Sequence, residues 1–329
     1  MDRGSVSNQD RIAVTGRIPQ AGLEMLHEAG EVVAWDSLDV PSVEQVHGMV
    51  RGAHAAVTLL TTKVDEAFLD AAGPQLKVVA NVAVGYNNID VAACARRGVV
   101  CTNTPGVLTE ATADIAMALV LMATRRLGEG ERVIRSEQPW QWGMFYMLGT
   151  GIQGRQLGIV GMGDIGQALA RRAKAFGMTI AYSNRKPVAP HVEVELGAQF
   201  MSLDELLATS DVVSVNCPYS PATHHLIGAA QFELMKPTAF LVNTARGPIV
   251  DEAALADALQ HSRISGAGLD VFENEPAVHP GLLECDNAVL VPHLGSATVE
   301  TRSAMARLAA HNAVNVLNGV EPPTPIPVP

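Results

Sequence analysis

The chain has few aromatic residues, few cysteines and no long apolar run, and these shortages exclude several classes of protein. Its longest apolar run, Ile115 to Ala123, is well short of the roughly 18 residues that span a membrane. The residues from Met1 to Arg11 are polar and contain no apolar signal segment, so secretion has no support. We therefore expect a protein of the cytoplasm that does not enter a membrane.

The cysteines do not form a recognisable metal or redox motif. Cys94, Cys101, Cys217 and Cys285 lack the C-x-x-C spacing of zinc and redox sites, and they are too sparse for a disulfide framework. The pattern favours a reducing compartment, and we predict no metal site.

Basic residues are scarce, with 23 lysines and arginines against 34 aspartates and glutamates and a net charge of -11. Such a surface repels polyanions, and no local basic run offsets the repulsion, so neither nucleic acid nor anionic membrane is an expected partner. An anionic substrate would have to be held by a few placed cations or backbone amides, which requires a pocket.

What the chain does have is a regular alternation of short β-branched runs with amphipathic stretches. At 329 residues it is long enough for two cores, and 48% apolar residues with 29 glycines suit layered α/β packing. Strands that alternate with helices form parallel sheets, so the predicted fold class is α/β with two doubly wound parallel-sheet domains. The predicted strands are Ile12 to Val14, Val32 to Trp35, Ala55 to Leu60, Val78 to Val82 and Val99 to Cys101 in a first set, and Gln156 to Val160, Thr179 to Ser183, Val212 to Asn216, Phe240 to Asn243, Gly266 to Asp270 and Val289 to Val291 in a second.

Two stretches without proline or glycine predict long helices. The first, Val107 to Arg126, ends in basic residues that suit the C-terminal end of a helix dipole, and we expect it to link the two domains. The second, Ala297 to Leu317, is followed by Gly319 and a proline-rich end that stop it.

A glycine pattern, G-x-G-x-x-G, follows the predicted strand Gln156 to Val160 and precedes a helical pattern that includes Ile165. Gly161 allows a tight turn, Gly163 lets the backbone approach a pyrophosphate, and Gly166 lets the helix lie close to the strand. In this context the pattern predicts dinucleotide binding, with an ordinary turn as the alternative. Asp164, at the start of the helix, adds a charge like that of the pyrophosphate and should lower cofactor affinity.

The end of the next predicted strand lacks the acidic residue that binds the adenosine ribose of NAD. Ser183 lies 22 positions after Gly161, and Asn184, Arg185 and Lys186 follow it. A hydroxyl, an amide and two cations suit a 2′-phosphate and not a bare diol, so NADP(H) is favoured and NAD remains possible. The alternative is a solvated turn before the next proline.

Three side chains near strand ends of the second set, or just after them, are candidates for catalysis. Arg246 lies in the segment Asn-Thr-Ala-Arg-Gly, Glu275 directly precedes a proline, and His293 lies in Pro-His-Leu-Gly. Taken alone, each has an ordinary alternative as a surface cation, a turn residue or a structural histidine. Glu273, two residues before Glu275, is the alternative acid.

With these segments the sequence resembles the D-isomer-specific 2-hydroxyacid dehydrogenase family, particularly its glyoxylate/hydroxypyruvate reductase branch. The resemblance runs from about residue 12 to about residue 322 and includes Val-Gly-Tyr-Asn-Asn-Ile-Asp from Val84 and Asn-Thr-Pro-Gly from Asn103. It implies a flavodoxin-like substrate domain, residues 1–103 plus 296–329, and a Rossmann cofactor domain, residues 104–295.

The family implies roles that suit the reduction of a 2-oxo acid, in which the nicotinamide supplies only the hydride. Arg246 would bind the carboxylate and polarise the carbonyl. His293 would donate the proton, because imidazole titrates near neutral pH. Glu275 would hydrogen-bond the other ring nitrogen, orient the ring and favour the imidazolium form.

The resemblance also assigns binding positions and a partner. The backbone N–H groups of Val84 and Gly85 would bind the carboxylate, and Leu59 and Leu60 would line the pocket, with core packing as their alternative. Trp142, in an aromatic cluster typical of interfaces, would reach the partner's active site in a homodimer, with plain dimer packing as the alternative. Besides the glycine turn, the implied cofactor contacts are Thr112, Cys217, Pro218, Thr223, Thr244, Asp270 and Gly295.

Other functions stay open from the sequence. A nicotinamide-sensing corepressor could share these motifs, and the side chain of the 2-oxo acid cannot be read, so 2-ketogluconate is an alternative to glyoxylate and hydroxypyruvate. Cys217 and Tyr219 depart from the residues more common in the family, which leaves the shape around the nicotinamide undetermined.

Overall fold

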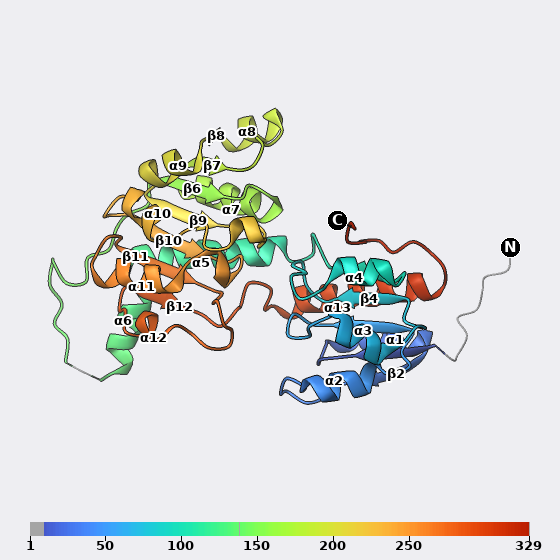
Figure 1. Ribbon diagram of the computed structural model, residues 1–329. Helices are drawn as coiled ribbons and strands as arrows, with labels where there is room; N and C mark the ends of the chain where they lie inside the picture. Colours follow the sequence, from blue (N-terminus) through green and yellow to red (C-terminus); the bar gives the residue numbers. More distant parts are fainter. Residues whose placement is uncertain (1–9, 138, 329) are drawn as a thin grey trace. The chain divides into compact units, whose positions relative to one another are not determined.

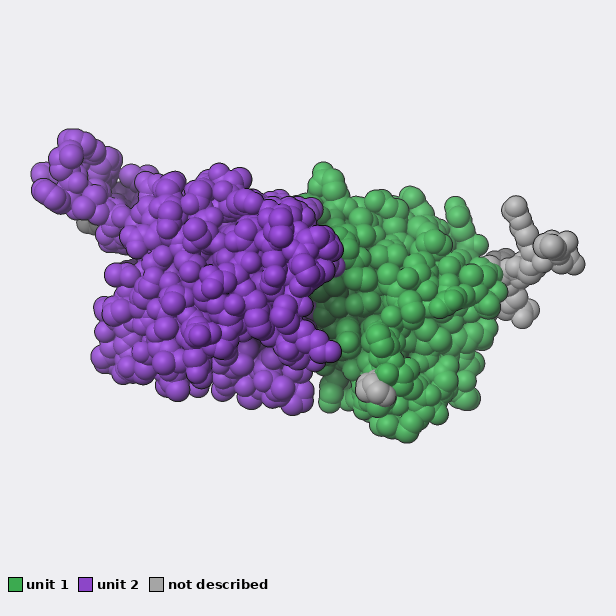
Figure 2. Space-filling view, turned by 90° about the horizontal axis from the view of Figure 1, so that it is seen from above, with its two compact units in different colours: residues 1–108, 297–329 green, residues 109–296 purple. Residues whose placement is uncertain are grey.

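The computed structural model describes residues 10–137 and 139–328, and the chain divides into two compact units (Figure 2). Unit 1 contains the described residues up to Leu108 and those from Ala297 on, and unit 2 contains Thr109–Ser296. Each unit is built around its own parallel sheet with helices on both faces, which confirms the predicted fold class.

Unit 1 has a five-stranded parallel sheet in the order β2-β1-β3-β4-β5, the order of flavodoxin-like folds. Its strands are β1 Arg11–Val14, β2 Glu31–Ala34, β3 Ala55–Thr58, β4 Val78–Asn81 and β5 Val100–Thr102. Its helices are α1 Gln20–Ala29, α2 Val43–Val50, α3 Glu66–Ala72, α4 Val91–Arg96 and α13 Val299–Leu317.

The strands of unit 1 bury both of their faces, as expected of a parallel sheet covered by helices. Ile12 and Val14 point toward α1 and α13, whereas Ala13, between them, packs with the side chains of α2, α3 and α4. Helix α13 comes from the far end of the chain, so unit 1 is complete only when the C-terminal segment packs on its sheet.

Unit 2 has a seven-stranded parallel sheet in the order β12-β11-β10-β9-β6-β7-β8, which contains the Rossmann order (Figure 1). Its strands are β6 Gln156–Val160, β7 Thr179–Ser183, β8 Ala198–Phe200, β9 Val212–Val215, β10 Phe240–Asn243, β11 Gly266–Leu269 and β12 Ala288–Leu290. Its helices are α5 Thr109–Thr124, α6 Leu127–Arg135, α7 Asp164–Ala175, α8 Pro190–Leu196, α9 Leu203–Thr209, α10 Ala229–Leu234, α11 Glu252–Gln260 and α12 Pro280–Leu283.

Helices cover both faces of this sheet. Helices α5, α7 and α8 pack on one face, where Leu119, Leu157 and Tyr182 are buried, and α9, α10 and α11 pack on the other. The longest apolar run, Ile115 to Ala123, lies in the C-terminal part of α5. No helix in the described part of the chain is long and apolar enough to cross a membrane.

Two parts of unit 2 were not predicted correctly. Strand β8 was missed because it is a three-residue edge strand whose last two residues are exposed, so it lacks an apolar pattern. The first long helix was predicted to continue to Arg126, but it ends at Thr124. Arg126 adopts a left-handed conformation with φ of 54°, and the separate helix α6 begins after it.

Helix α1 packs closely on α13 through Gly22. A Cβ atom at Gly22 would lie 2.8 Å from the Cβ and from the carbonyl oxygen of Ala306, and helix backbone cannot yield easily. Gly22→Ala should therefore lower the free energy of unfolding, by about 1–3 kcal/mol. Gly48→Ala is the matched control, because Gly48 is helical, exposed and has nothing near its Cβ position. It should stabilise by roughly 0.5–1 kcal/mol.

Calorimetric unfolding of both variants checks this expectation. Equal shifts of the same sign would contradict the close packing at Gly22.

Candidate active site

The candidate catalytic residues of unit 2 lie at the carboxyl edge of its sheet, where the carboxyl ends of all the parallel strands lie. Strands β10, β11 and β12 are neighbours in register, with Asn243 opposite Leu269 and Leu269 opposite Leu290. The segments that follow them carry Arg246, Asp270 and His293. Loops at this edge bind ligands in open α/β sheets, so the position suits a functional site.

His293 and Glu275 form the central pair. The Nδ1 atom of His293 lies 2.8 Å from Oε2 of Glu275, and the other oxygen of Glu275 accepts the N–H of Phe272 at 3.0 Å. Burial raises the pKa of Glu275, but the hydrogen bonds from His293 and Phe272 outweigh burial and hold the pKa below its usual value. Glu275 is therefore a carboxylate that orients the ring, and the His293 side chain stays 34% exposed, accessible to a ligand.

The backbone at His293 has an unusual conformation, and hydrogen bonds to the two residues that follow it hold it in place. His293 has φ of 52°, in the left-handed region that side chains seldom adopt. The next two N–H groups, of Leu294 and Gly295, are both accepted by the carboxylate of Asp270, at 2.5 and 2.8 Å. Asp270 is 1% exposed, and burial raises its pKa. The hydroxyl of Thr112 also donates to the carbonyl of Gly295, at 3.2 Å.

Arg246 is held by a tight turn beside the same loop. The side chain of Asn243 donates to the Arg246 carbonyl at 2.9 Å and accepts the N–H of Ala245 at 3.0 Å. A Cβ atom at Gly247 would lie 1.9 Å from the carbonyl carbon of Phe272, so only glycine lets the two backbones approach. Burial lowers the pKa of Arg246, and the negative charge of Glu275 opposes this shift. The two charged groups are therefore close enough to interact.

The glycine turn has the geometry that a dinucleotide requires. Gly161 has φ of 102°, and its Cβ position lies 2.4 Å from the backbone nitrogen of Cys217. A Cβ at Gly166 would meet the carbonyl oxygen of Gly161 at 2.5 Å, whereas nothing lies within 4 Å of the Cβ position of Gly163. Open space at Gly163, at the N-terminus of α7, is where a pyrophosphate would approach. Asp164 and Ile165, in the first turn, are exposed and half-buried.

The residues after β7 separate into two roles. The Oδ1 atom of Asn184 accepts the N–H of Met162 at 2.7 Å, which ties the end of β7 to the glycine turn. Ser183 is half-buried, and Arg185 and Lys186 are exposed. Both cations are thus accessible beside the turn.

The remaining predicted cofactor positions lie on the same edge. Cys217 and Pro218 follow β9, and burial raises the pKa of the Cys217 thiol to about 11. The Thr223 hydroxyl accepts the N–H of Ser220 at 2.7 Å, so it closes its own turn. Thr244 follows β10, and its buried hydroxyl has no hydrogen-bond partner among the described residues, which leaves it for a ligand.

Unit 1 brings the other predicted substrate residues together at the carboxyl edge of its own sheet. Val84 and Gly85 lie in the β4–α4 loop, residues 82–90, and Leu59 and Leu60 follow the neighbouring strand β3. All four are half-buried. Trp142 lies elsewhere, in unit 2, on the connection from α6 to β6, and is 79% exposed.

Sequence reasoning missed the residues that hold these loops. Asp270 and Asn103 act as hydrogen-bond clamps through contacts between distant segments, whereas Asn243 and Asn81 close turns within three or four residues of their own loops. The only available signal was their position at or near the carboxyl ends of predicted strands. Among the described residues, no cluster of histidine, cysteine, aspartate or glutamate is placed to hold a metal ion.

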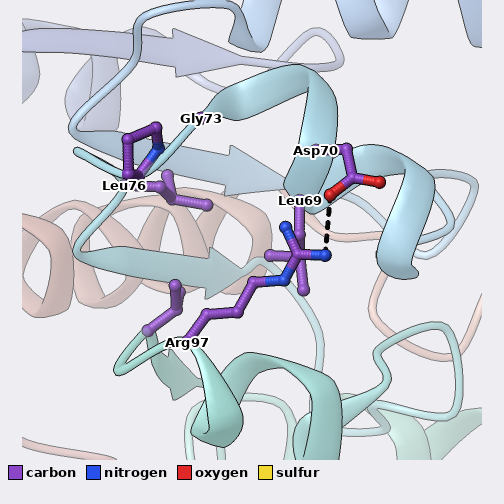
Figure 3. Close-up of a pocket in the computed structure, with 7 residues that line it drawn as sticks. Leu69, Asp70, Gly73, Leu76 and Arg97 are labelled. Atoms are coloured by element: carbon purple, nitrogen blue, oxygen red, sulfur yellow. Dashed lines mark ion pairs between the residues drawn. The ribbon is translucent and has the colours of Figure 1, made fainter.

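Unit 1 has a cavity of about 430 Å³, whose lining includes Leu69, Asp70 and Arg97 (Figure 3). It opens near the amino ends of β4 and β5, at Leu76 and Val99, opposite to the edge that carries the β4–α4 loop. The Arg97 guanidinium beside it is paired with Asp70 at 2.7 Å. The cavity is therefore separate from the unit 1 residues predicted to bind the substrate.

Comparison with known proteins places the chain in a family. Residues 117–295 match the family described as D-isomer specific 2-hydroxyacid dehydrogenase, NAD binding domain. A glyoxylate reductase of Thermococcus onnurineus is 49% identical over 319 residues, which cover 95% of each chain.

Solved structures agree. A Thermus thermophilus protein is 42% identical, with a TM-score of 0.89, and the match covers 96% of this chain and 100% of that one. An NADPH-dependent glyoxylate/hydroxypyruvate reductase from Sinorhizobium meliloti, in complex with NADP and malonate, is 37% identical with a TM-score of 0.83 over 96% of both chains. These findings confirm the resemblance inferred from the sequence motifs. The chain belongs to the D-isomer-specific 2-hydroxyacid dehydrogenase family and is an oxidoreductase with a nicotinamide-nucleotide-binding domain.

Proposed function

We propose that this protein reduces a small 2-oxo acid of the glyoxylate or hydroxypyruvate type to the D-2-hydroxy acid, with NADPH as the reductant and His293 as the proton donor. The observation that carries the proposal is the hydrogen-bonded pair of His293 and Glu275, in the same neighbourhood as Arg246 and at the same sheet edge as the glycine turn. The similarity to glyoxylate reductases supports the choice of substrate class.

The pair suits proton donation to a carbonyl oxygen. Because Glu275 occupies Nδ1 of the ring, Nε2 is the atom left to face the substrate. The carboxylate fixes the ring plane, and Asp270 fixes the backbone that carries the ring. The bound nicotinamide would supply the hydride to the carbonyl carbon, and the proton from His293 completes the alcohol.

The substrate carboxylate needs donors of its own. Arg246 would bind it, since a guanidinium forks onto planar oxygens, and the backbone N–H groups of Val84 and Gly85 would bind it as well. Leu59 and Leu60 would line the space for the substrate side chain. Their half-buried positions beside the β4–α4 loop support this assignment.

The features beside the glycine turn favour NADPH. Gly163 leaves room for a pyrophosphate, and Arg185 and Lys186 are exposed cations at the end of β7, where an NAD enzyme would carry an acid. Asp164 would reduce affinity for either cofactor. The relative that binds NADP supports the same choice.

We also propose a homodimer in which Trp142 reaches the partner's active site. Trp142 is 79% exposed and Phe145 is 88% exposed, and large apolar side chains gathered on a surface are typical of interfaces. Sedimentation at the mass of one chain, 34.7 kDa, would contradict the dimer.

The reaction is tested by following NADPH absorbance with a panel of glyoxylate, hydroxypyruvate, pyruvate and 2-ketogluconate. Wild-type protein should oxidise NADPH with at least one of them. His293→Gln should lower kcat by roughly 10²–10⁴-fold, because it loses the proton donor, while NADPH affinity stays unchanged. His261→Gln, at an exposed helix end, is the control and should keep full activity.

Failure of every 2-oxo acid would refute the proposed reaction. Loss of NADPH binding in His293→Gln would mark His293 as a structural residue.

Cofactor choice is tested at the end of β7. Arg185→Ala should raise KM for NADPH about tenfold or more, because the 2′-phosphate loses a cationic partner. KM for NADH should stay nearly unchanged, because NADH lacks that phosphate. Arg171→Ala, which removes an exposed cation of α7 paired with Glu195, is the control. A wild-type preference for NADH would contradict the assignment of NADPH as the cofactor.

The Glu275 pair should leave a signature in stability. Because folding lowers the pKa of Glu275, its carboxylate stabilises the folded state at pH values above the unfolded pKa of about 4.3. This contribution is lost as the pH falls through the lowered pKa of the folded state. The melting temperature of Glu275→Gln should therefore lie below that of wild type at pH 7, and the gap should close below about pH 4. The gap should be small, because the Glu275 side chain is 36% exposed and solvent screens the pair.

Thermal unfolding between pH 3 and pH 8 measures the gap. Glu24→Gln, on an exposed position of α1, is the control. A gap that stays constant or widens in acid would contradict the assignment.

A further inference from the structure

The β4–α4 loop carries a run of three carbonyl groups that are all held from within unit 1. The carbonyl of Ala83 accepts the N–H of Thr104 at 2.8 Å. The carbonyl of Val84 accepts Nδ2 of Asn103 at 2.8 Å, and the carbonyl of Gly85 accepts Nδ2 of Asn81 at 3.0 Å. Two of the three donors are therefore asparagine side chains.

Holding a carbonyl also aims the N–H of the same peptide. The C=O and N–H of a trans peptide point in opposite directions, and the cis bond found in the described residues is elsewhere. The N–H groups of Val84 and Gly85 are thus turned away from the donors that hold Ala83 and Val84. Within residues 10–137 and 139–328, neither N–H has a hydrogen-bond acceptor.

The asparagine side chains are themselves fixed. Asn81 is fully buried, and its Oδ1 accepts the hydroxyl of Thr58 at 3.0 Å and the amide of Asn88 at 3.3 Å. Asn88 in turn donates to the carbonyls of Leu59 and Thr62, at 3.2 and 2.9 Å. This network ties the β4–α4 loop to the segment after β3.

The second asparagine is fixed by the C-terminal part of unit 1. The carbonyl of Asn103 accepts the hydroxyl of Thr324 at 2.7 Å and the amide of Asn312 at 3.3 Å. Asn312, on α13, is fully buried and also accepts the N–H of Thr324 at 3.1 Å. The backbone carbonyl of Asn103 is therefore anchored to the C-terminal part of unit 1, and its side chain holds the carbonyl of Val84.

From this geometry we infer that Asn103 and Asn81 are positioning residues that preorganise the Val84 and Gly85 N–H groups to bind the carboxylate of the substrate. The inference rests on the proposed function, in which this loop is the carboxylate site. Backbone donors aimed in one direction form an anion-binding concavity, and donors fixed in advance bind without a reorganisation cost. Without Asn103 the Val84–Gly85 peptide is free to rotate, and a carbonyl oxygen would then face the anion and repel it.

Asn103 is the residue to change, because it is half-buried, whereas loss of the fully buried Asn81 would weaken the unit itself. Asn103→Ala should raise KM for the 2-oxo acid about tenfold and leave KM for NADPH unchanged. Asn103→Asp keeps the size of the side chain but places an oxygen where Nδ2 donates, so its effect should be at least as large. A purely structural role would lower the melting temperature without this split between the two KM values.

The control is Asn287→Ala, since Nδ2 of Asn287 also caps backbone carbonyls, of Ser265 and Leu259, but in unit 2 at the amino ends of its strands. It should leave both KM values unchanged. Thermal unfolding of each variant establishes that it is folded at the assay temperature, and Asn103→Asp replaces Asn103→Ala should the alanine variant fail to fold.

A binding measurement separates this inference from the proposed reaction. Oxamate carries a carboxylate beside a carbonyl but cannot be reduced, and calorimetry in the presence of NADPH measures its affinity. Wild type should bind oxamate about tenfold more tightly than Asn103→Ala. If wild type binds oxamate but reduces no 2-oxo acid, the proposed reaction fails while the comparison of affinities still decides the role of Asn103. Equal oxamate affinity in wild type and a folded Asn103 variant overturns the inference, as does a wild type that does not bind oxamate.

Discussion

Parallel hydrogen bonding between neighbouring strands is the constraint on which the candidate site depends. Each backbone N–H and C=O in a buried strand must be paired, and parallel pairing in register leaves every carboxyl end at one edge of the sheet. Six loops from widely separated parts of unit 2 therefore meet at that edge. They carry Gly161, Ser183, Cys217, Thr244, Asp270 and His293.

Bringing loops to one edge does not by itself orient their side chains. That orientation comes from side chains that hydrogen-bond to backbone groups of the same loop or of a neighbouring one. Asp270 accepts two N–H groups directly after His293, and Asn243 bonds to both sides of the turn before Arg246. The contacts are short-range and directional, so they fix a ring or a guanidinium more firmly than apolar packing would. Asn81 and Asn103 act in the same way on the β4–α4 loop of unit 1.

Much of the fold could be predicted because strong periodic signals lie within single segments. Eleven strands and two long helices were predicted from short apolar runs or from stretches without proline and glycine, and the bounds of all of them lie within two residues of the observed elements. Strand β8 and the break at Arg126 escaped because the first is an exposed edge strand and the second is a single left-handed residue. Neither feature is visible in the spacing of apolar residues along the sequence.

The chemistry of individual residues was readable from the sequence, because a guanidinium, an imidazole and a glycine turn each have few uses after a strand. Which partner each one has was not readable. Asp270 was expected to contact the cofactor, and only the folded chain shows both of its oxygens occupied by N–H groups 24 and 25 residues further on. The sequence by itself determined the elements, the kinds of side chain and their order. The tertiary structure decided which hydrogen bonds aim them. Those of Asn243 and Asn81 close turns of three or four residues, whereas those of Asp270 and Asn103 join segments that are distant along the chain and adjacent only after the sheets have formed.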